Sequence, residues 1–232
     1  MKCIRETPNL YRLVHIAPIN SYFVREEDGL TLVDANLPGR GGQIAAAASK
    51  LGLPIRRVVL THAHQDHVGS LDEICTQFPN LEVFIGSREA RLLRQDFSFD
   101  TQEPKSRLKG KFPAVKTRPT RVLDNGDQVG SLQAFSSPGH TPGHVAYLDM
   151  RDRALLAGDA FQTAGGIAVA GVVRPLFPLP AWFTWERRLA AESARKLGDL
   201  RPSLLACGHG PVLPSPEKEI KRAIEVAQRR LG

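Results

Sequence analysis

Apolar and polar positions divide the first half of the chain into short strand-like and helix-like runs. Apolar runs alternate with amphipathic runs that are bounded by serine, glycine or proline. The predicted strands are residues 22–24, 30–33, 55–61 and 81–85, and the predicted helices are residues 41–52, 70–77 and 87–95. The first two strands form a hairpin that turns at Asp28–Gly29. Ser70 and Glu73 have the S-x-x-E spacing of a capping box, and Ser87 is the expected cap of the third helix.

The second half repeats this alternation after an irregular interval. Residues 97–119 show no hydrophobic period and are expected to form a basic, irregular insertion. The predicted strands are residues 120–124, 128–137, 144–150, 154–159 and 203–207, and the predicted helices are residues 185–197, capped by Thr184, and a C-terminal helix that begins at Ser215. The apolar stripe of the last helix is Ile220, Ala223, Ile224, Ala227 and Leu231. Because strands and helices recur in both halves, the pattern predicts an α/β layered fold of sheets covered by helices.

The length of the chain suits one domain with a full core, since 42% of its 232 residues are hydrophobic. We therefore expect a single domain over residues 1–232. No apolar run reaches the roughly eighteen residues that a transmembrane helix needs. Residues 5–9 are polar where a signal peptide requires an apolar segment, so a cytoplasmic protein is expected. Cys3, Cys75 and Cys207 are too few for a disulfide framework.

The formal net charge of +7 is concentrated in one segment. Residues 88–121 contain ten basic and four acidic side chains, so most of the excess positive charge lies there. The favoured interpretation is a solvated, mobile surface segment. The alternative interpretation is a lid whose charge attracts anionic substrates.

Three histidines and an aspartate lie within six positions at the end of the strand predicted at 55–61. They are His62, His64, Asp66 and His67. A strand would place residues 62, 64 and 66 on one face and residue 67 on the other, and a helix would leave residue 64 opposite the rest. Only a loop brings all four side chains together, and loops held by strands and helices commonly carry functional residues.

Further candidate metal ligands follow other strand-like runs or precede them. They are His140, His144, Asp159 and His209. Six of the seven histidines occur at such junctions, and only His15 is assigned a purely structural role. Imidazole and carboxylate ligands together suit zinc, with iron or manganese as alternatives. Cys207 belongs to a core-like run and is interpreted as a small buried residue.

The sequence THAHQDH at residues 61–67 resembles the H-x-H-x-D-H motif of the metallo-β-lactamase superfamily. TLVDAN precedes this motif, and PGHTPGH, AGDAF and CGHGPV follow it in the family's order, so the resemblance covers nearly the whole chain. The glyoxalase II and lactonase branch is the most similar. The resemblance implies a four-layer αβ/βα sandwich of two mixed β-sheets flanked by helices. It also implies two divalent metal ions at one edge of the sheets.

The resemblance assigns a role to each of these polar residues. The first metal ion would be bound by His62, His64 and His140, the second by Asp66, His67 and His209, and Asp159 would bridge both. Asp34 would support the site from beneath, and His144 would either orient a ligand or be a buried polar residue. Two such ions would lower the pKa of a bound water to near neutrality. The water would then supply a hydroxide nucleophile. Asp66 would orient this hydroxide or pass a proton to the leaving group.

The favoured function is hydrolysis of a small ester, thioester or lactone. Asp159 in the bridging position argues against a true β-lactamase, whereas sulfur dioxygenase relatives with a single iron carry similar motifs. Only 23 residues follow His209, which is short for the glutathione-binding region of glyoxalase II. Gln162 stands where well-studied lactonases of the family have a tyrosine. A nucleic-acid phosphodiesterase that uses segment 88–121 is the alternative, and a metal-binding protein without turnover is a third hypothesis.

The apolar segment that follows Asp159 must run close to the metal ligands. The residues expected to form a substrate pocket are Phe161, Gln162, Phe177, Trp182 and Phe183. Trp185 is assigned to the core. A homodimer contact is another interpretation of this apolar segment. The expected partner is a small-molecule substrate, and an anionic one would suit the residual positive charge of the metal ions.

Overall fold

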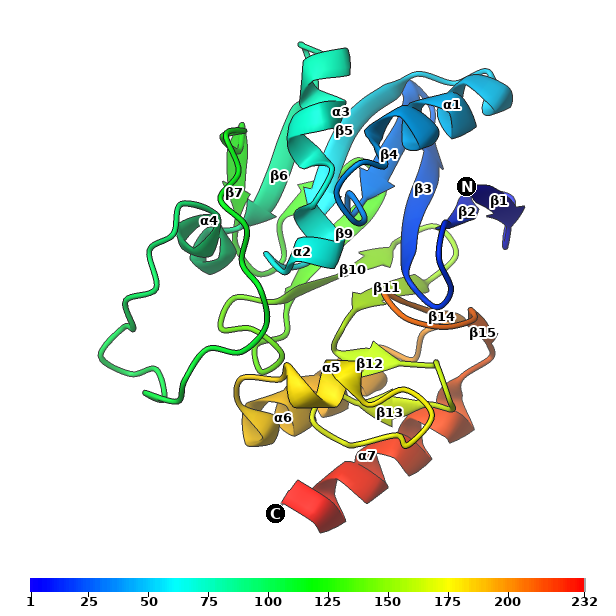
Figure 1. Ribbon diagram of the computed structural model, residues 1–232. Helices are drawn as coiled ribbons and strands as arrows, with labels where there is room; N and C mark the ends of the chain where they lie inside the picture. Colours follow the sequence, from blue (N-terminus) through cyan, green and yellow to red (C-terminus); the bar gives the residue numbers. More distant parts are fainter. Residues whose placement is uncertain (232) are drawn as a thin grey trace.

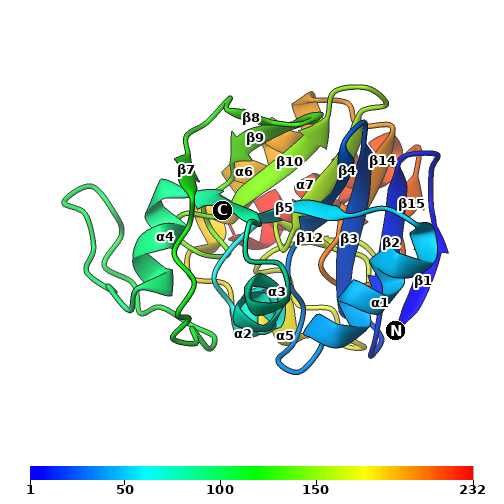
Figure 2. The same ribbon diagram turned by 90° about the horizontal axis from the view of Figure 1, so that it is seen from above.

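The computed structural model describes residues 1–231, in which two β-sheets face each other and helices cover their outer sides (Figure 1, Figure 2). The seven strands of the first sheet lie side by side in sequence order: β1 (Lys2–Arg5), β2 (Leu10–Val14), β3 (Asn20–Glu26), β4 (Gly29–Val33), β5 (Ile55–Leu60), β6 (Glu82–Gly86) and β7 (Arg121–Leu123). Strands β1 to β4 pair antiparallel, whereas β4 to β7 pair parallel. The first sheet is therefore mixed.

The second sheet has six strands in the order β15-β14-β11-β10-β9-β8. These are β8 (Gln128–Val129), β9 (Leu132–Ser136), β10 (Val145–Asp149), β11 (Ala154–Gly158), β14 (Leu204–Cys207) and β15 (Leu213–Pro214). Only β11 and β14 pair parallel. A short separate pair is formed by β12 (Phe161–Gln162) and β13 (Ala168–Val169).

Helices cover the two outer faces and mark one edge of the sheets (Figure 1). The first sheet is covered by α1 (Gly41–Leu51), α3 (Leu71–Gln77) and α4 (Ser87–Leu93), and the second by α6 (Arg187–Asp199) and α7 (Glu217–Leu231). The single turns α2 (Gln65–Val68) and α5 (Leu179–Trp182) lie at the edge. The expected α/β sandwich of two mixed sheets is confirmed. Among the described residues, no helix combines the length and the apolar character needed to span a bilayer.

Alternating side chains along the strands divide the core into three layers. In β3, Tyr22 and Val24 pack between the two sheets, whereas Phe23 packs on the side of α1 and α3. In β10, Tyr147 packs between the sheets and Ala146 packs on the side of α6 and α7. Successive side chains of a strand point to opposite faces, so residues 22–24 of β3 and 145–148 of β10 form continuous hydrophobic runs because both faces are covered.

The capping box predicted at the start of α3 is wrong, although the helix begins where expected. Ser70 is the N-cap residue, but its side chain makes no capping hydrogen bond and instead donates to the carbonyl of Leu37 at 2.6 Å. The carboxylate of Glu73 accepts from the N–H groups of Gly39 and Gly41 at 2.6 and 3.1 Å. The pair therefore holds the loop that leads into α1, because that loop offers unpaired N–H groups.

Two further predicted caps are displaced. Ser87 lies inside α4, one residue past the N-cap. The N-cap of α6 is Glu186, whose side chain accepts from the N–H of Arg188 at 3.3 Å. Thr184 precedes this helix and donates its hydroxyl to the carbonyl of Pro180 at 2.7 Å. The Thr184 hydroxyl is bound to the preceding turn, and Glu186, which directly precedes the helix, caps it instead.

Glu89 of α4 connects two loops that belong to different sheets. Its side chain is fully buried and accepts from the N–H of Ala63 at 2.8 Å and from the N–H of Gly143 at 2.8 Å. Burial raises the pKa of Glu89, and these hydrogen bonds act in the opposite direction. The first loop follows β5 and the second joins β9 to β10, so one carboxylate fixes their relative position.

We expect Glu89→Ala to lower the free energy of unfolding by about 2–4 kcal/mol, because two buried N–H groups lose their acceptor. Urea denaturation measures this change. Glu82→Ala is the matched control, since Glu82 is an exposed residue of the adjacent strand β6, and it should change stability by less than about 0.5 kcal/mol. Equal stability of the two variants would show that Glu89 does not connect the loops.

Candidate metal centre

Seven histidine and aspartate side chains meet at the edge of the sandwich where α2 and α5 lie. They are His62, His64, Asp66, His67, His140, Asp159 and His209. The first four come from the loop after β5 and from α2, and the others follow β9, β11 and β14. All of them except Asp66 are buried. The structure thus brings together every residue that the resemblance assigned as a ligand.

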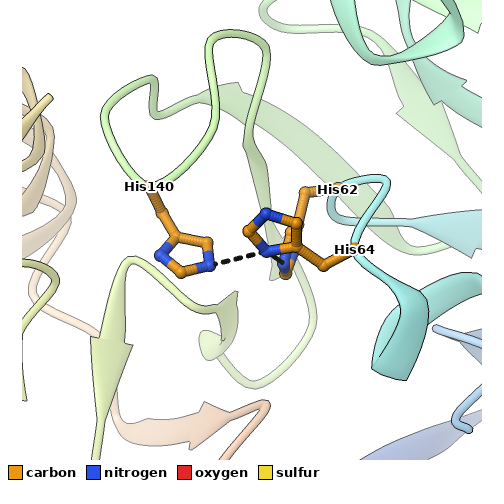
Figure 3. Close-up of side chains that lie close together, drawn as sticks. All are labelled: His62, His64 and His140. Carbon is orange, nitrogen blue, oxygen red and sulfur yellow. Dashed lines mark hydrogen bonds between the residues drawn. The ribbon is translucent and has the colours of Figure 1, made fainter. Parts of the chain in front are cut away.

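The side chains of His62, His64 and His140 converge on one point (Figure 3). His62 Nε2 lies 3.1 Å from His64 Nδ1, and His64 Nδ1 lies 3.0 Å from His140 Nε2. In Figure 3 the ring of His140 reaches from the β9–β10 loop toward the two rings that come from the end of β5. We call these residues the first trio.

The hydrogen bonds of Thr61 determine which nitrogen of His62 carries the proton. Thr61 donates its hydroxyl to Asp34 Oδ2 at 2.8 Å, so its oxygen is free to accept from His62 Nδ1 at 3.0 Å. The lone pair of His62 is therefore on Nε2, which faces the other two rings. Burial, followed by the neighbouring histidines, lowers the pKa of His62 well below its usual value, which is consistent with a neutral ring.

The same reasoning assigns the other two rings of the first trio. His64 Nε2 donates to the carbonyl of Lys109 at 2.8 Å, which leaves the lone pair on Nδ1. Thr184 donates to Pro180, so it accepts from His140 Nδ1 at 3.3 Å and the lone pair of His140 is on Nε2. Three lone pairs therefore lie about 3 Å apart with no proton between them. Such a cluster is repulsive unless a cation occupies its centre.

The second trio consists of Asp66, His67 and His209. His209 Nε2 lies 3.3 Å from Asp66 Oδ2, and His67 Nε2 lies 3.8 Å from the same oxygen. Burial lowers the pKa of His209, but Asp159 and Asp66 outweigh it and raise this pKa to about 9. Burial also opposes ionisation of Asp66, yet His67 and His209 hold its pKa below the usual range. These carboxylates therefore keep His209 protonated at neutral pH beside an ionised Asp66.

Asp159 lies between the two trios. Its Oδ1 is 3.4 Å from His67 Nε2, and its Oδ2 is 3.4 Å from His140 Nε2 and 3.1 Å from His209 Nε2. Within residues 1–231, the buried atoms Asp159 Oδ1 and His67 Nε2 have no hydrogen-bond partner. Buried polar atoms are rarely left without a partner, so these two atoms suit a metal ion as their ligand. The residues present thus fit two divalent ions with Asp159 between them.

Asp34 and His144 support the ligands without facing the ions. Asp34 Oδ2 accepts from His67 Nδ1 at 2.7 Å, and a carboxylate behind a histidine fixes its tautomer and ring orientation. His144 Nδ1 lies 2.8 Å from Ser137 Oγ, and His144 Nε2 accepts from the N–H of Asp159 at 3.0 Å. Burial lowers the pKa of His144 to about 3, so it is a neutral side chain that orients Asp159.

A cavity of about 470 Å³ opens onto both trios. Its polar wall includes His64, Asp66, His140, Asp159 and His209. Its apolar wall comes from the β2–β3 turn, residues 17–19, and from residues 177–183. Asp66 is the ligand with the greatest exposure to this space, since 28% of its side chain is accessible. A small molecule with an apolar group can therefore approach the metal positions directly.

Three of the five residues expected in the substrate pocket do not line this cavity, whereas Phe177 and Phe183 do. Phe161 is fully buried in the core between the second sheet and its helices, because β12 folds back onto that sheet. Gln162 is buried and donates to the carbonyl of Phe177 at 3.1 Å, so it acts on the cavity only through that residue. Trp182 is 55% exposed and lies outside the cavity lining.

Residues 97–119, which we call the strap, are irregular as predicted, but they pack against the metal centre. The carbonyl of Lys109 accepts from His64, and the carbonyl of Lys111 accepts from the N–H of Gln65 at 2.9 Å. The ammonium of Lys109 donates to the carbonyl of Thr184 at 2.8 Å. The interpretation as a solvated surface segment thus describes many of its side chains but not its main chain, which supports a candidate ligand.

Several residues that shape the metal centre carried no signal in the sequence. Thr61, Thr184 and Lys109 act through single hydrogen bonds to ligand rings. Glu89 acts through the backbone of two loops. None of these residues belongs to a motif with a fixed spacing, and all but Thr61 are remote in sequence from the residues they hold. Thr61 is the exception, because it directly precedes His62 and its position beside the histidine cluster could have indicated its role.

The comparisons with known proteins agree with this geometry. A family model described as the metallo-β-lactamase superfamily matches residues 16–209. The chain belongs to the metallo-β-lactamase superfamily. It is 46% identical over 213 residues to the uncharacterized protein YobT of Bacillus subtilis (strain 168), with 91% of each chain covered. It is 31% identical to the probable metallo-hydrolase YflN of the same strain, with 92% of this chain and 88% of that one covered.

More distant relatives of this superfamily member are similar over shorter or more divergent stretches. A hydroxyacylglutathione hydrolase of Enterobacter sp. (strain 638) is 31% identical over 144 residues, which are 60% of this chain and 45% of that protein. The crystal structure of TTHA1623 in a di-iron-bound form has a TM-score of 0.65 at 24% identity and covers 88% of this chain and 95% of its own. Because the first match covers less than half of the hydroxyacylglutathione hydrolase, membership of the glyoxalase II branch stays a prediction. The second match shows a shared fold.

Gly110 of the strap lies where its neighbour His64 leaves no space. A Cβ atom at Gly110 would stand 2.4 Å from His64 Nε2, and the φ of Gly110 is +89°. We expect Gly110→Ala to displace the His64 ring and to weaken zinc binding about ten- to a hundredfold, the range typical for loss of a ligand's support. Competition with a chromophoric chelator measures this affinity.

Gly126 offers a matched control for the backbone strain of that substitution. Its φ is +93°, and a Cβ atom there would meet nothing within 4 Å. Gly126→Ala therefore introduces the same left-handed strain without a clash at the metal centre. Equal zinc affinities of the two variants would contradict a role for the strap in positioning His64.

Proposed function

We propose that this protein is a dinuclear metal-dependent hydrolase that cleaves a small ester, thioester or lactone. The observation that carries the proposal is the open cavity above two adjoining sets of ligand atoms, with Asp66 at its surface. Zinc is the expected metal, because the five imidazoles and two carboxylates of the candidate ligand set favour it, and iron or manganese are the alternatives. The superfamily membership supports metal-dependent hydrolysis in general terms.

Each of the two trios would hold one metal ion. When bound, two divalent ions lower the pKa of a water to near neutrality and polarise a substrate carbonyl. His62, His64 and His140 would hold one ion, Asp66, His67 and His209 would hold the other, and Asp159 would contact both. Because the side chains come from rigid strand ends, they require little rearrangement when substrate binds.

Asp66 is the best placed side chain to move a proton. It lines the cavity, its Oδ2 lies 3.3 Å from His209 Nε2, and its low pKa keeps it ionised at neutral pH. An ionised carboxylate accepts hydrogen bonds, so Asp66 would orient the attacking water. It would then carry the proton released from that water to the leaving group.

The apolar wall favours an acyl compound over a nucleic acid. Phe177 packs its ring 5.2 Å from the ring of His209, and Phe183 lies on the same side of the cavity. In the basic segment, Arg88 is paired with Glu103, and Arg91 is paired with two aspartates. These ion pairs reduce the positive charge available for phosphates, so the phosphodiesterase alternative has less support than the sequence suggested.

We expect the zinc-loaded protein to contain about two metal equivalents per chain and to hydrolyse members of a panel of thioesters, esters and lactones. His62→Ala and Asp66→Ala should lower kcat/KM by at least about a hundredfold, because each removes a ligand. Elemental analysis and a chromogenic thiol assay measure these quantities. His15→Ala is the matched control, since His15 stands outside the metal clusters found among residues 1–231.

Selective turnover of phosphodiesters would replace this function with the nuclease alternative, and unchanged hydrolysis in His62→Ala would refute the metal mechanism. Retained metal with no turnover of any panel member would favour a metal-binding protein instead. A phosphodiester and a β-lactam are assayed beside this panel, and selective hydrolysis of the β-lactam would move the protein to that branch of the superfamily.

A further inference from the structure

The cavity at the metal centre has two chemically different sides. One side is apolar and comes from the β2–β3 turn and from the segment that includes α5. The other side includes Gly110 and Lys111 of the strap. The strap passes the edge of the sandwich opposite the β2–β3 hairpin (Figure 1, Figure 2). A substrate whose carbonyl lies at the metal centre therefore meets hydrocarbon in one direction and the strap in the other.

Lys111 is the one lysine or arginine among the described residues that line this cavity. The residue is exposed, and within residues 1–231 its ammonium has neither an ion pair nor a hydrogen bond. The cationic groups of Arg88 and Arg91 differ, because carboxylates of the same segment bind them. The charge of Lys111 is therefore available to a molecule in the cavity.

The main chain fixes the position of Lys111 beside the metal centre. Its carbonyl accepts from the N–H of Gln65 at 2.9 Å, and the preceding turn is held by the hydrogen bond from His64 to Lys109. Gln65 directly precedes Asp66, which lines the same cavity. The attachment point of the lysine side chain is thus tied to the loop that carries the candidate ligands, so its ammonium has a limited range.

We propose that Lys111 binds an anionic group of the substrate, so that the natural substrate is an acyl compound with both an apolar part and a carboxylate or similar anion. The proposal rests on the proposed hydrolase function and specifies its substrate class. The anion lies toward the strap and the apolar part lies toward Phe177 and Phe183. Asp66 and Asp159 are the carboxylates of the cavity lining. Two bound divalent ions would exceed their charge, so the loaded site as a whole would also attract anions.

The test compares matched substrates that differ only in one charge. The first pair is the 4-nitrophenyl monoester of glutaric acid and 4-nitrophenyl pentanoate, and the second pair carries the carboxylate on a thiol leaving group or lacks it. We expect Lys111→Met to lower the ratio of kcat/KM for the anionic over the neutral member of one pair by about fivefold, the upper range for a partly exposed ion pair. Lys111→Arg should restore most of this ratio.

Lys116→Met is the matched control, because it removes the same charge from the same strap. Lys116 is exposed, does not line the cavity and is held through its N–H by Asp72. Its ratios should stay within about twofold of those of the parent protein. The effect of Lys111→Met should also shrink in 0.5 M salt, since screening weakens an exposed attraction.

A binding measurement separates this inference from the proposed function. Calorimetry with the non-hydrolysable thioether analogues of both pairs requires no turnover. Weaker binding of an anionic analogue to Lys111→Met, with no turnover by the parent, would refute the hydrolase function but support anion recognition. Turnover by the parent with the same charge selectivity in Lys111→Met and Lys116→Met would refute the role of Lys111 and leave the hydrolase function in place.

Discussion

The centre of this molecule is a set of buried nitrogen and oxygen atoms whose lone pairs point at one another. Thr61, Thr184 and the carbonyl of Lys109 each accept the proton of one imidazole and so turn its other nitrogen inward. Without a cation, this arrangement places electron-rich atoms about 3 Å apart on side chains that are almost fully buried. The surrounding hydrogen bonds must therefore resist the repulsion that the fold concentrates there.

The two sheets are bonded to each other close to this edge, which explains how the repulsion is resisted. Tyr22 donates its hydroxyl to the carbonyl of Cys207 at 2.6 Å, and Asn20 donates to the same carbonyl at 3.0 Å. Tyr147 donates to the carbonyl of Leu60 at 2.8 Å. These polar groups are buried, and each hydrogen bond joins one sheet to the other. The strand ends that carry the ligands are thereby fixed relative to one another.

The sequence allowed the layered fold and the ligand set to be predicted because both depend on local patterns. Strands between covered faces contain continuous hydrophobic runs, and the ligand motifs stand at strand ends with short spacing. The residues that line the cavity were harder to predict from the sequence. Residues that adjoin Asp159 in sequence turn away with β12 into the core, as Phe161 does. Phe177 reaches the cavity only through the path of the loop. Such a path depends on tertiary packing, which no period in the sequence records.

The hydrogen-bond partners of the helix caps and of the candidate metal ligands were the hardest feature to predict from the sequence, for a related reason. Ser70 and Glu73 have the spacing of a capping box, yet the adjoining loop at residues 37–41 offers a carbonyl acceptor to Ser70 and N–H donors to Glu73. Glu89 and Lys109 reach their partners across many residues of sequence. A local motif describes only what neighbouring residues offer, and the three-dimensional fold adds competitors that the motif does not contain.

The strap supports His64 with a main-chain carbonyl, so its support of the metal centre is separate from its effect on substrate choice. A carbonyl group is the same in every amino acid, so the identity of the side chain at position 109 does not alter the acceptor itself. Lys111 lines the cavity and its side chain has no part in that support, whereas Gly110 has no room for a side chain beside His64. Substitutions of Lys111 can therefore change which substrate is accepted while the metal centre stays intact. A segment of this kind allows relatives to diverge in specificity without first losing the catalytic apparatus.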